Sequence, residues 1–202
     1  MDADWSDYYR KISGRPPRPL LAKALTAWGD RPAGAAVDLG CGDGTETLAL
    51  LAGGWSVTAV DSSPASAELI RERADATHRP RLEIQTVAIE AATLTDIDLA
   101  YAGYSLPFVP PHAFPAVWSR IRASLRPGAV LAANLFGPND TWATDTDMTF
   151  HDRSVVAGLL EGLEILEFEE TDEDGVAASG PKHWHFFEFV ARRPGYTKRR
   201  GP

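Results

Sequence analysis

The sequence predicts an α/β fold in which a doubly wound, mostly parallel sheet is flanked by helices. Short apolar runs typical of buried strands alternate with helical patterns through the first two-thirds of the 202 residues. Two strand-like runs then follow each other without an intervening helix, which predicts a C-terminal antiparallel hairpin. A chain of this length buries roughly 70% of the surface that its unfolded form exposes, so we expect one domain over residues 1–202.

Local signals place seven strands and at least five helices. The strands are predicted at residues 35–39, 56–60, 82–87, 98–102, 129–135, 163–170 and 183–191, and the helices from near residue 20 and at 45–52, 64–76, 113–124 and 152–160. Gly53 and Gly54 end the first leucine-rich helix, and Pro64 opens the next one with Ser62 or Ser63 as its N-cap.

The elements after residue 80 are predicted from the alternation of apolar and polar residues and from helix stop signals. Leu82 and Ile84 share one face of residues 82–87 and alternate with polar residues, as in a half-buried strand. The sequence Arg126-Pro127-Gly128 ends the helix before it and leads into an apolar strand. Because ligands of such sheets bind at the carboxyl ends of the parallel strands, the loops at 137–149 and 171–181 are predicted to border the site.

Charge and cysteine content exclude several classes of protein. The 20 basic and 28 acidic residues give a net charge of −8, the wrong sign for wrapping nucleic acid. The single cysteine, Cys41, forms no internal disulfide or cysteine-based zinc site, and no metal site is predicted. No apolar run approaches the ~18 residues of a membrane helix, and the acidic N-terminus has no secretory pattern. We therefore expect a cytoplasmic monomer or homodimer, with residues 194–202 as a flexible basic tail.

A glycine-rich turn follows the first strand. Gly40, Gly42 and Gly44 have the spacing G-x-G-x-G, and they allow the backbone to approach a ligand closely. A dinucleotide fingerprint would place a third small residue at position 45, where this chain has Thr45. Asp61 ends the second strand, 21 residues after Gly40, a position from which a carboxylate accepts hydrogen bonds from both ribose hydroxyls. The pair predicts an adenosine-containing ligand.

The run Asp38-Leu-Gly-Cys-Gly-Asp-Gly-Thr45 together with Asp61 resembles the class I S-adenosylmethionine-dependent methyltransferases. The resemblance includes Val87-Ala-Ile-Glu90 and Asp98-Leu-Ala-Tyr-Ala-Gly-Tyr104, and it implies a Rossmann-like fold and S-adenosyl-L-methionine as the cofactor. One departure stands out: many members carry an aspartate near position 88 or 89 for the adenine amino group, and this chain has alanine and isoleucine there.

Within that family, the chain is similar to the small tellurite-resistance-type methyltransferases. The likeness rests on a tyrosine-containing N-terminal helix, on Arg15, on residues 148–150 and on the final hairpin ending in Val190-Ala-Arg-Arg193. It implies that the helical segment 1–34 covers the site.

The resemblance also implies the residues of the cofactor site. The three glycines would lie under the amino-acid tail of the cofactor, Asp61 would hold its ribose, and Ile89 would press on its adenine. Asp38 would bind the ammonium group or orient the loop. The full set of implied cofactor-binding residues is Tyr9, Arg15, Asp38, Gly40, Cys41, Gly42, Asp43, Gly44, Thr45, Asp61, Ser62, Ile89, Glu90, Ala102 and Tyr104.

Several of these residues have a second interpretation. Arg15 and Arg18 flank two prolines, and an arginine there could clamp a carboxylate of the cofactor or of a substrate, or simply lie on the surface. Trp5, Tyr8 and Tyr9 either close over the site or anchor the N-terminal segment to the core.

The C-terminal hairpin offers the candidate proton acceptors. His183 and His185 share one face of the last strand, and either imidazole could take a proton from a substrate or make a structural hydrogen bond instead. Eight of the 14 residues from 161 to 174 are acidic, which predicts either an electrostatic collar for cationic substrates or a solvated edge strand.

Three functions compete at this point. The leading one is a methyltransferase that acts on a small molecule, with S-adenosyl-L-homocysteine as the product. A nicotinamide-dependent reductase is disfavoured by Thr45 and by the closing hairpin. A non-catalytic relative that binds the cofactor as a sensor or partner subunit is the remaining alternative.

Overall fold

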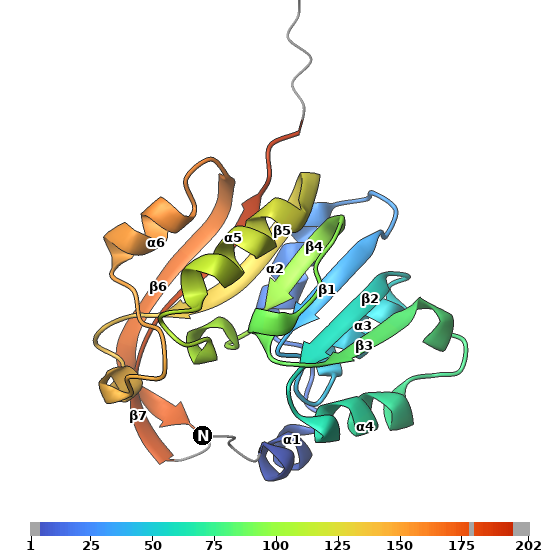
Figure 1. The fold of residues 1–202 in the computed structure, drawn as a ribbon, viewed down its shortest axis with the longest axis horizontal. Helices are drawn as coiled ribbons and strands as arrows, with labels where there is room; N and C mark the ends of the chain where they lie inside the picture. Colours follow the sequence, from blue (N-terminus) through green and yellow to red (C-terminus); the bar gives the residue numbers. More distant parts are fainter. Residues whose placement is uncertain (1–4, 178–179, 196–202) are drawn as a thin grey trace, which may run out of the picture.

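The computed structural model describes residues 5–177 and 180–195. Seven strands form a single sheet in the order β3-β2-β1-β4-β5-β7-β6 (Figure 1). The first five strands pair in parallel, whereas β7 is antiparallel to both β5 and β6. The predicted α/β class and the closing hairpin are therefore confirmed.

The elements follow the predicted alternation. The strands are β1 (Ala35–Leu39), β2 (Ser56–Asp61), β3 (Leu82–Thr86), β4 (Ile97–Ala102), β5 (Leu125–Phe136), β6 (Glu164–Ala177) and β7 (Gly180–Arg192). The α-helices are α1 (Ser6–Ile12), α2 (Pro19–Trp28), α3 (Thr45–Ala52), α4 (Pro64–Arg73), α5 (Phe114–Ser124) and α6 (Arg153–Leu159). Short 3-10 helices occur at η1 (Arg79–Arg81), η2 (Ile89–Ala91), η3 (Leu106–Phe108) and η4 (Thr141–Thr144).

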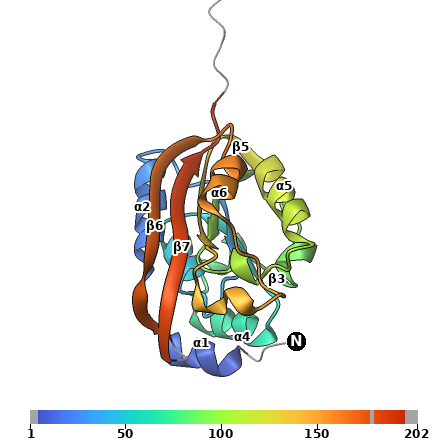
Figure 2. The same cartoon turned by 90° about the vertical axis from the view of Figure 1, so that its left-hand side faces the viewer.

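Two apolar layers cover the sheet. On one face, Leu20, Leu21 and Ala24 of α2 pack with Leu50 and Leu51 of α3. The other face packs against α5 and α6, and Figure 2 shows α5 and α2 on opposite sides of the sheet. No helix among the described residues is both long and apolar enough to span a bilayer. The central parallel strands β1, β4 and β5 are thus covered on both faces, which explains their largely apolar sequences, whereas β3 at the edge of the sheet has exposed residues.

The C-terminal hairpin is longer than predicted. Residues 171–177 belong to β6, so the expectation of a loop over 171–181 is wrong. Thr171 pairs with Phe186, and Asp172 and Asp174 pair with His185 and His183. Acidic residues have a low intrinsic preference for strands, and cross-strand partners outweigh that preference here.

Other boundaries shift by a few residues. The helix predicted at 64–76 ends at Arg73, because Ala74 is extended. Strand β5 begins at Leu125, before the predicted stop signal, and its pairing with β4 is irregular near Ile97. The tail residues 196–202 lie outside the described residues.

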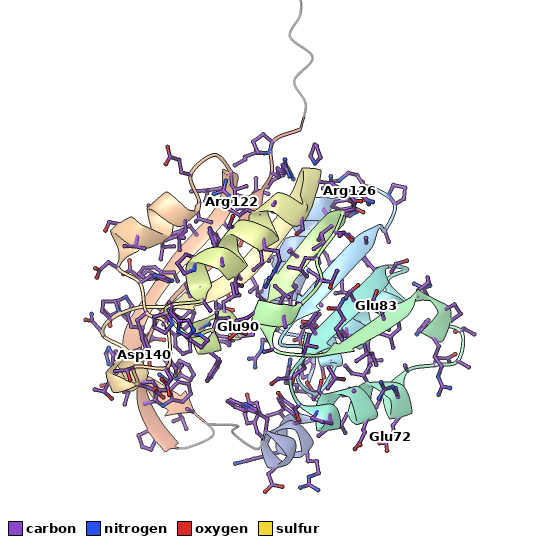
Figure 3. All side chains as sticks on the ribbon, viewed as in Figure 1. Glu72, Glu83, Glu90, Arg122, Arg126 and Asp140 are labelled. Atoms are coloured by element: carbon purple, nitrogen blue, oxygen red, sulfur yellow. The ribbon has the colours of Figure 1, made fainter. Side chains whose placement is uncertain are left out.

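A buried ion pair fastens the loop after β5 to the start of β7. The ammonium group of Lys182 contacts the carboxylate of Asp140, and both side chains are almost fully buried. The rings of Trp142 and Trp184 surround the same ammonium group at 4.1 and 4.3 Å. Asp140 also accepts hydrogen bonds from two backbone N–H groups, at Trp142 and His185. Figure 3 shows Asp140 at the end of the sheet opposite Arg122 and Arg126.

We expect Lys182→Met to cost about 3–5 kcal/mol of unfolding free energy, because it leaves the Asp140 carboxylate buried without its counter-charge. Urea unfolding followed by circular dichroism measures this loss. The double variant Lys182→Met with Asp140→Asn should lose clearly less than the sum of the two single variants. Additive losses would show that the two side chains do not stabilise each other.

Candidate functional site

The glycine loop lies between β1 and α3. Gly40 and Cys41 donate backbone hydrogen bonds to the carbonyl of Val60, at 2.8 and 3.0 Å, which ties the loop to the end of β2. Gly40 has a positive φ of 71°, and a Cβ atom there would lie 2.3 Å from the Cβ of Ser105. The glycine is therefore required both by its backbone conformation and by the close approach of the segment after β4.

Asp61 holds three segments together at the end of β2. Its carboxylate accepts hydrogen bonds from the backbone N–H groups of Gly42 and Ser63, each at 2.9 Å. The Tyr9 hydroxyl donates to the same carboxylate, with 3.2 and 3.1 Å to its two oxygens. Burial first, and then the negative charge of Asp61, raise the pKa of Tyr9, so this hydroxyl stays protonated and acts as a donor.

Helix α1 lies across the glycine loop. The Tyr9 ring is 3.3 Å from the place where a Cβ atom of Gly42 would stand. At the start of the helix, the Trp5 ring packs edge to face against the ring of Phe108 in η3, with 5.2 Å between the centroids. Figure 1 shows α1 beside α4 at this end of the sheet. The aromatic residues of α1 therefore both close over the loop and anchor the helix.

Arg15 is engaged within the protein. Its guanidinium forms a two-pronged ion pair with Glu46, at 2.7 and 2.6 Å. Burial alone would raise the pKa of Glu46, but the hydrogen bonds from Arg15 and from the Arg18 backbone outweigh burial and lower it. The predicted carboxylate-binding fork of Arg15 thus already holds a carboxylate of this chain, because Glu46 of α3 lies next to it.

Asp43 and Thr45 contact each other at the start of α3, and their predicted cofactor contacts stay predictions. The Thr45 hydroxyl contacts the Asp43 carboxylate, which also pairs with Arg73 at 3.2 Å. Asp43 is fully buried, and its Oδ1 atom has no hydrogen-bond partner among the described residues. These contacts fix the start of α3 against α4.

Asp38 is a buried carboxyl under the loop. It is 2% exposed and accepts a hydrogen bond of 2.7 Å from the Thr47 hydroxyl. Burial, followed by the nearby charge of Glu46, raises its pKa to about 7. The thiol of Cys41 is also buried, and burial raises its pKa, so it packs as a neutral side chain.

The end of β4 carries a strained tyrosine. Tyr104 has a φ of 59°, which is uncommon for a residue other than glycine and marks a constrained site. Its ring lies 6.0 Å from that of Trp184 and 5.4 Å from that of Phe186. Burial first, and then the charge of Glu188, raise the pKa of Tyr104 to about 12. Ala102, two residues earlier, is fully buried.

The segment after β3 provides the other predicted contacts. Ile89 and Glu90 open η2, and Arg120 donates hydrogen bonds to both of their carbonyls, at 2.9 and 2.8 Å. Both side chains are partly exposed, whereas Ser62 near the glycine loop is exposed. These placements leave the predicted contacts of Ile89, Glu90 and Ser62 as predictions.

Both candidate histidines are engaged by neighbouring groups. The two ring nitrogens of His183 contact Asp172 and Asp174, each at 2.7 Å. His185 is buried, and its ring contacts the Asn139 N–H and the Glu170 carboxylate. Their catalytic role stays a prediction, while these contacts describe structural hydrogen bonding across the hairpin. The predicted mouth loop at 137–149 packs near η3, where Thr149 donates to the carbonyl of Pro107.

Three groups near the site were missed by sequence reasoning. Glu46 lies inside the helix after the glycine motif and gives no motif signal. Tyr101 is 2% exposed, and its hydroxyl has no hydrogen-bond partner among the described residues. Lys182 carries a buried charge that a surface-like sequence pattern conceals. The sequence signal that could have pointed to Glu46 is the pair of arginines that flank Pro16 and Pro17, because both arginines contact it.

The geometry fits an adenosine ligand with an amino-acid tail. The Asp61 carboxylate accepts a hydrogen bond from the glycine loop, whose backbone turns from β1 into α3. The orphaned hydroxyl of Tyr101 is a buried polar atom at the same end of the sheet. A carboxylate acceptor, a glycine-rich strand–helix turn and an unpartnered donor together match the polar parts of such a ligand.

Comparisons with known proteins agree with this geometry. The family described as "Methyltransferase domain" matches residues 36–128. Trans-aconitate 2-methyltransferase of Paracidovorax citrulli is 37% identical over 139 residues, which are 65% of this chain and 50% of that protein. The chain thus spans about half the length of that relative.

Two solved structures share the fold. TehB from Haemophilus influenzae superposes with a TM-score of 0.74 at 19% identity, over 93% of this chain and 66% of that one. The 1,6-didemethyltoxoflavin-N1-methyltransferase of Burkholderia thailandensis, with bound 1,6-didemethyltoxoflavin and S-adenosylhomocysteine, gives 0.65 at 20% identity, over 94% and 84%. At these identities the likeness concerns the fold.

We expect Asp38→Asn to gain stability relative to the wild type as the pH rises from about 4 to 7. Over that interval the unfolded wild-type chain releases the Asp38 proton while the folded chain retains it, so the wild type loses at most about 1.4 kcal/mol per pH unit. Above pH 7 both states are ionised and the difference becomes constant. Urea unfolding at five pH values measures it, and a flat difference would contradict the raised pKa.

Proposed function

We propose that this chain, by sequence and fold a member of the class I S-adenosylmethionine-dependent methyltransferases, transfers a methyl group to a nucleophilic atom of a small molecule. The observation that carries the proposal is the Asp61 carboxylate beside the glycine loop at the carboxyl ends of β1 and β2. Ligands of open α/β sheets bind at this edge.

S-adenosyl-L-methionine supplies, when bound, an electrophilic methyl group on a sulfonium. Transfer is an in-line displacement, in which the sulfur–carbon bond breaks as the bond to the acceptor atom forms. The protein therefore accelerates the reaction mainly by alignment and by exclusion of water. Asp61 would accept hydrogen bonds from the ribose hydroxyls, and the glycine loop would let the backbone approach the amino-acid tail. Trp5, which precedes α1, and Tyr9 of α1 would shield the loop from water.

We assign the cofactor contacts to the loop and to the strand ends. Gly40, Gly42 and Gly44 would lie under the amino-acid tail, Asp61 would be the ribose acceptor, and Ile89 would pack against the adenine ring. Asp38, Asp43 and Thr45 act as positioning residues, because each is buried and bonded within the protein.

A small acceptor is the substrate class that the comparisons favour. One sequence relative is a methyltransferase of trans-aconitate and one structural neighbour is a methyltransferase of 1,6-didemethyltoxoflavin, both small molecules. The acceptor would lie beside Tyr104, whose ring stands with Trp184 and Phe186 at the edge where β4 ends and β7 begins.

We expect Asp61→Asn to weaken S-adenosylhomocysteine binding about 10- to 100-fold. The substitution removes a charged acceptor, and hydrogen bonds to charged groups contribute about 1.5–3 kcal/mol each. Isothermal titration calorimetry measures the affinity. Asp96→Asn is the matched control, because Asp96 is an exposed aspartate that precedes β4. Unchanged affinity in a folded Asp61→Asn protein would refute the ribose assignment.

We expect Tyr9→Phe to strengthen S-adenosylhomocysteine binding about fivefold. The Tyr9 hydroxyl occupies both oxygens of the carboxylate that the ribose needs, and a net hydrogen bond contributes about 1 kcal/mol. Tyr8→Phe is the control in the same helix. Weaker binding by Tyr9→Phe would mean that the hydroxyl contacts the cofactor instead of competing with it.

A further inference from the structure

The two arginines that flank Pro16 and Pro17 have different surroundings. Arg15 is held in its ion pair with Glu46. The Arg18 backbone N–H also donates to Glu46, at 2.9 Å, but its guanidinium goes elsewhere and lies over the Tyr104 ring at 4.9 Å from the centroid. Within residues 5–177 and 180–195, no carboxylate lies within 4 Å of the Arg18 guanidinium, and it donates no hydrogen bond to the protein.

A second unpartnered donor lies in the same neighbourhood. The Tyr101 hydroxyl is buried without a hydrogen-bond partner among the described residues. It stands beside Gly103, because a Cβ atom there would come within 2.6 Å of the hydroxyl oxygen. Burial raises the pKa values of Tyr101 and Tyr104, and the charge of Arg18 opposes that rise at both. The Arg18 guanidinium lies over the ring of Tyr104, the residue that follows Gly103, and Tyr101 packs in one cluster with Leu20 and Leu21 of the helix that Arg18 precedes. Both donors are therefore at the carboxyl end of β4.

The nearby carboxylates are already bound by other side chains. Glu46 is bound by Arg15, and Glu188 is bound by Lys23 at 2.9 Å and by Asn134 at 3.1 Å. Arg18 therefore presents a positive charge that this part of the chain does not neutralise. The Arg18 guanidinium is half-buried, and neither it nor the buried Tyr101 hydroxyl has a hydrogen-bond acceptor in the part of the protein that the structure describes. Leaving such donors without an acceptor costs free energy, which a ligand that accepts their hydrogen bonds would recover.

We propose that Arg18 and Tyr101 together bind a carboxylate group of a ligand in this site. The guanidinium has a fixed fork of N–H donors that matches the two oxygens of a carboxylate, and the neutral tyrosine adds one O–H donor. The ring of Tyr104 holds the fork in place by a cation–π contact.

The proposal rests on the proposed function, which supplies two sources of a carboxylate. One is the amino-acid end of the cofactor, and the other is an acidic methyl acceptor. Arg18, rather than the predicted Arg15, is then the arginine that recognises the ligand, and Arg15 is the positioning residue that fixes α3.

Titrations with Arg18→Gln distinguish the two sources. S-adenosylhomocysteine carries the amino-acid carboxylate, whereas 5′-methylthioadenosine lacks it, so both are titrated by calorimetry. Trans-aconitate is then titrated into protein saturated with S-adenosylhomocysteine. If the cofactor supplies the carboxylate, Arg18→Gln weakens S-adenosylhomocysteine at least tenfold and leaves methylthioadenosine unchanged. If the acceptor supplies it, only the trans-aconitate affinity falls.

Two further variants make the test specific. Arg10→Gln removes an equal charge from an exposed residue of α1 and should change none of the three affinities more than twofold. Tyr101→Phe deletes only the hydroxyl and should weaken the same ligand that Arg18→Gln weakens.

Two results would overturn the carboxylate pair. One is that all three affinities stay within twofold in Arg18→Gln. The other is that methylthioadenosine weakens as much as S-adenosylhomocysteine, because such a loss does not depend on a carboxylate. If the wild type binds neither adenosine ligand, the proposed function fails. Trans-aconitate is then titrated into the protein alone: binding that Arg18→Gln abolishes supports the pair, and any other result overturns it.

Discussion

Asp61 accepts hydrogen bonds from the glycine loop, from the start of the segment before α4 and from α1. These three segments come from separate parts of the chain, and one carboxylate sets their spacing. Without it, the N–H of Gly42 and the N–H of Ser63 would each lack this partner at a partly buried position. The arrangement explains why a single acidic residue at the end of β2 both shapes the loop and offers the acceptor of the site.

Four acidic residues gather around this edge of the sheet, and the protein accommodates them in three ways. Asp38 is buried with a raised pKa, whereas Asp43 and Glu46 form ion pairs with Arg73 and Arg15. Asp61 is held by several neutral donors, from Tyr9, Gly42 and Ser63. Neutral donors are easier for a ligand to replace than an ion pair, because breaking a partly buried ion pair leaves two charges without partners.

The sequence predicted the sheet, its first five strands and the glycine loop, because each follows from short-range apolar patterns and turn residues. It did not predict the length of the hairpin. Acidic residues such as Asp172 and Asp174 disfavour strands locally, and their pairing with His185 and His183 depends on contacts that are distant in sequence. The contacts of Asp61 with Gly42 and Tyr9, which are distant in sequence, were not predictable for the same reason.

The choice between Arg15 and Arg18 shows this limit most clearly. The two residues are three positions apart, flank the same prolines and have the same chemistry, so no local pattern separates them. Glu46, about 30 residues later, decides the matter by binding the Arg15 side chain and only the backbone of Arg18. A cation is available for a ligand only after the carboxylates of the protein have been assigned, and that assignment is a property of the folded chain.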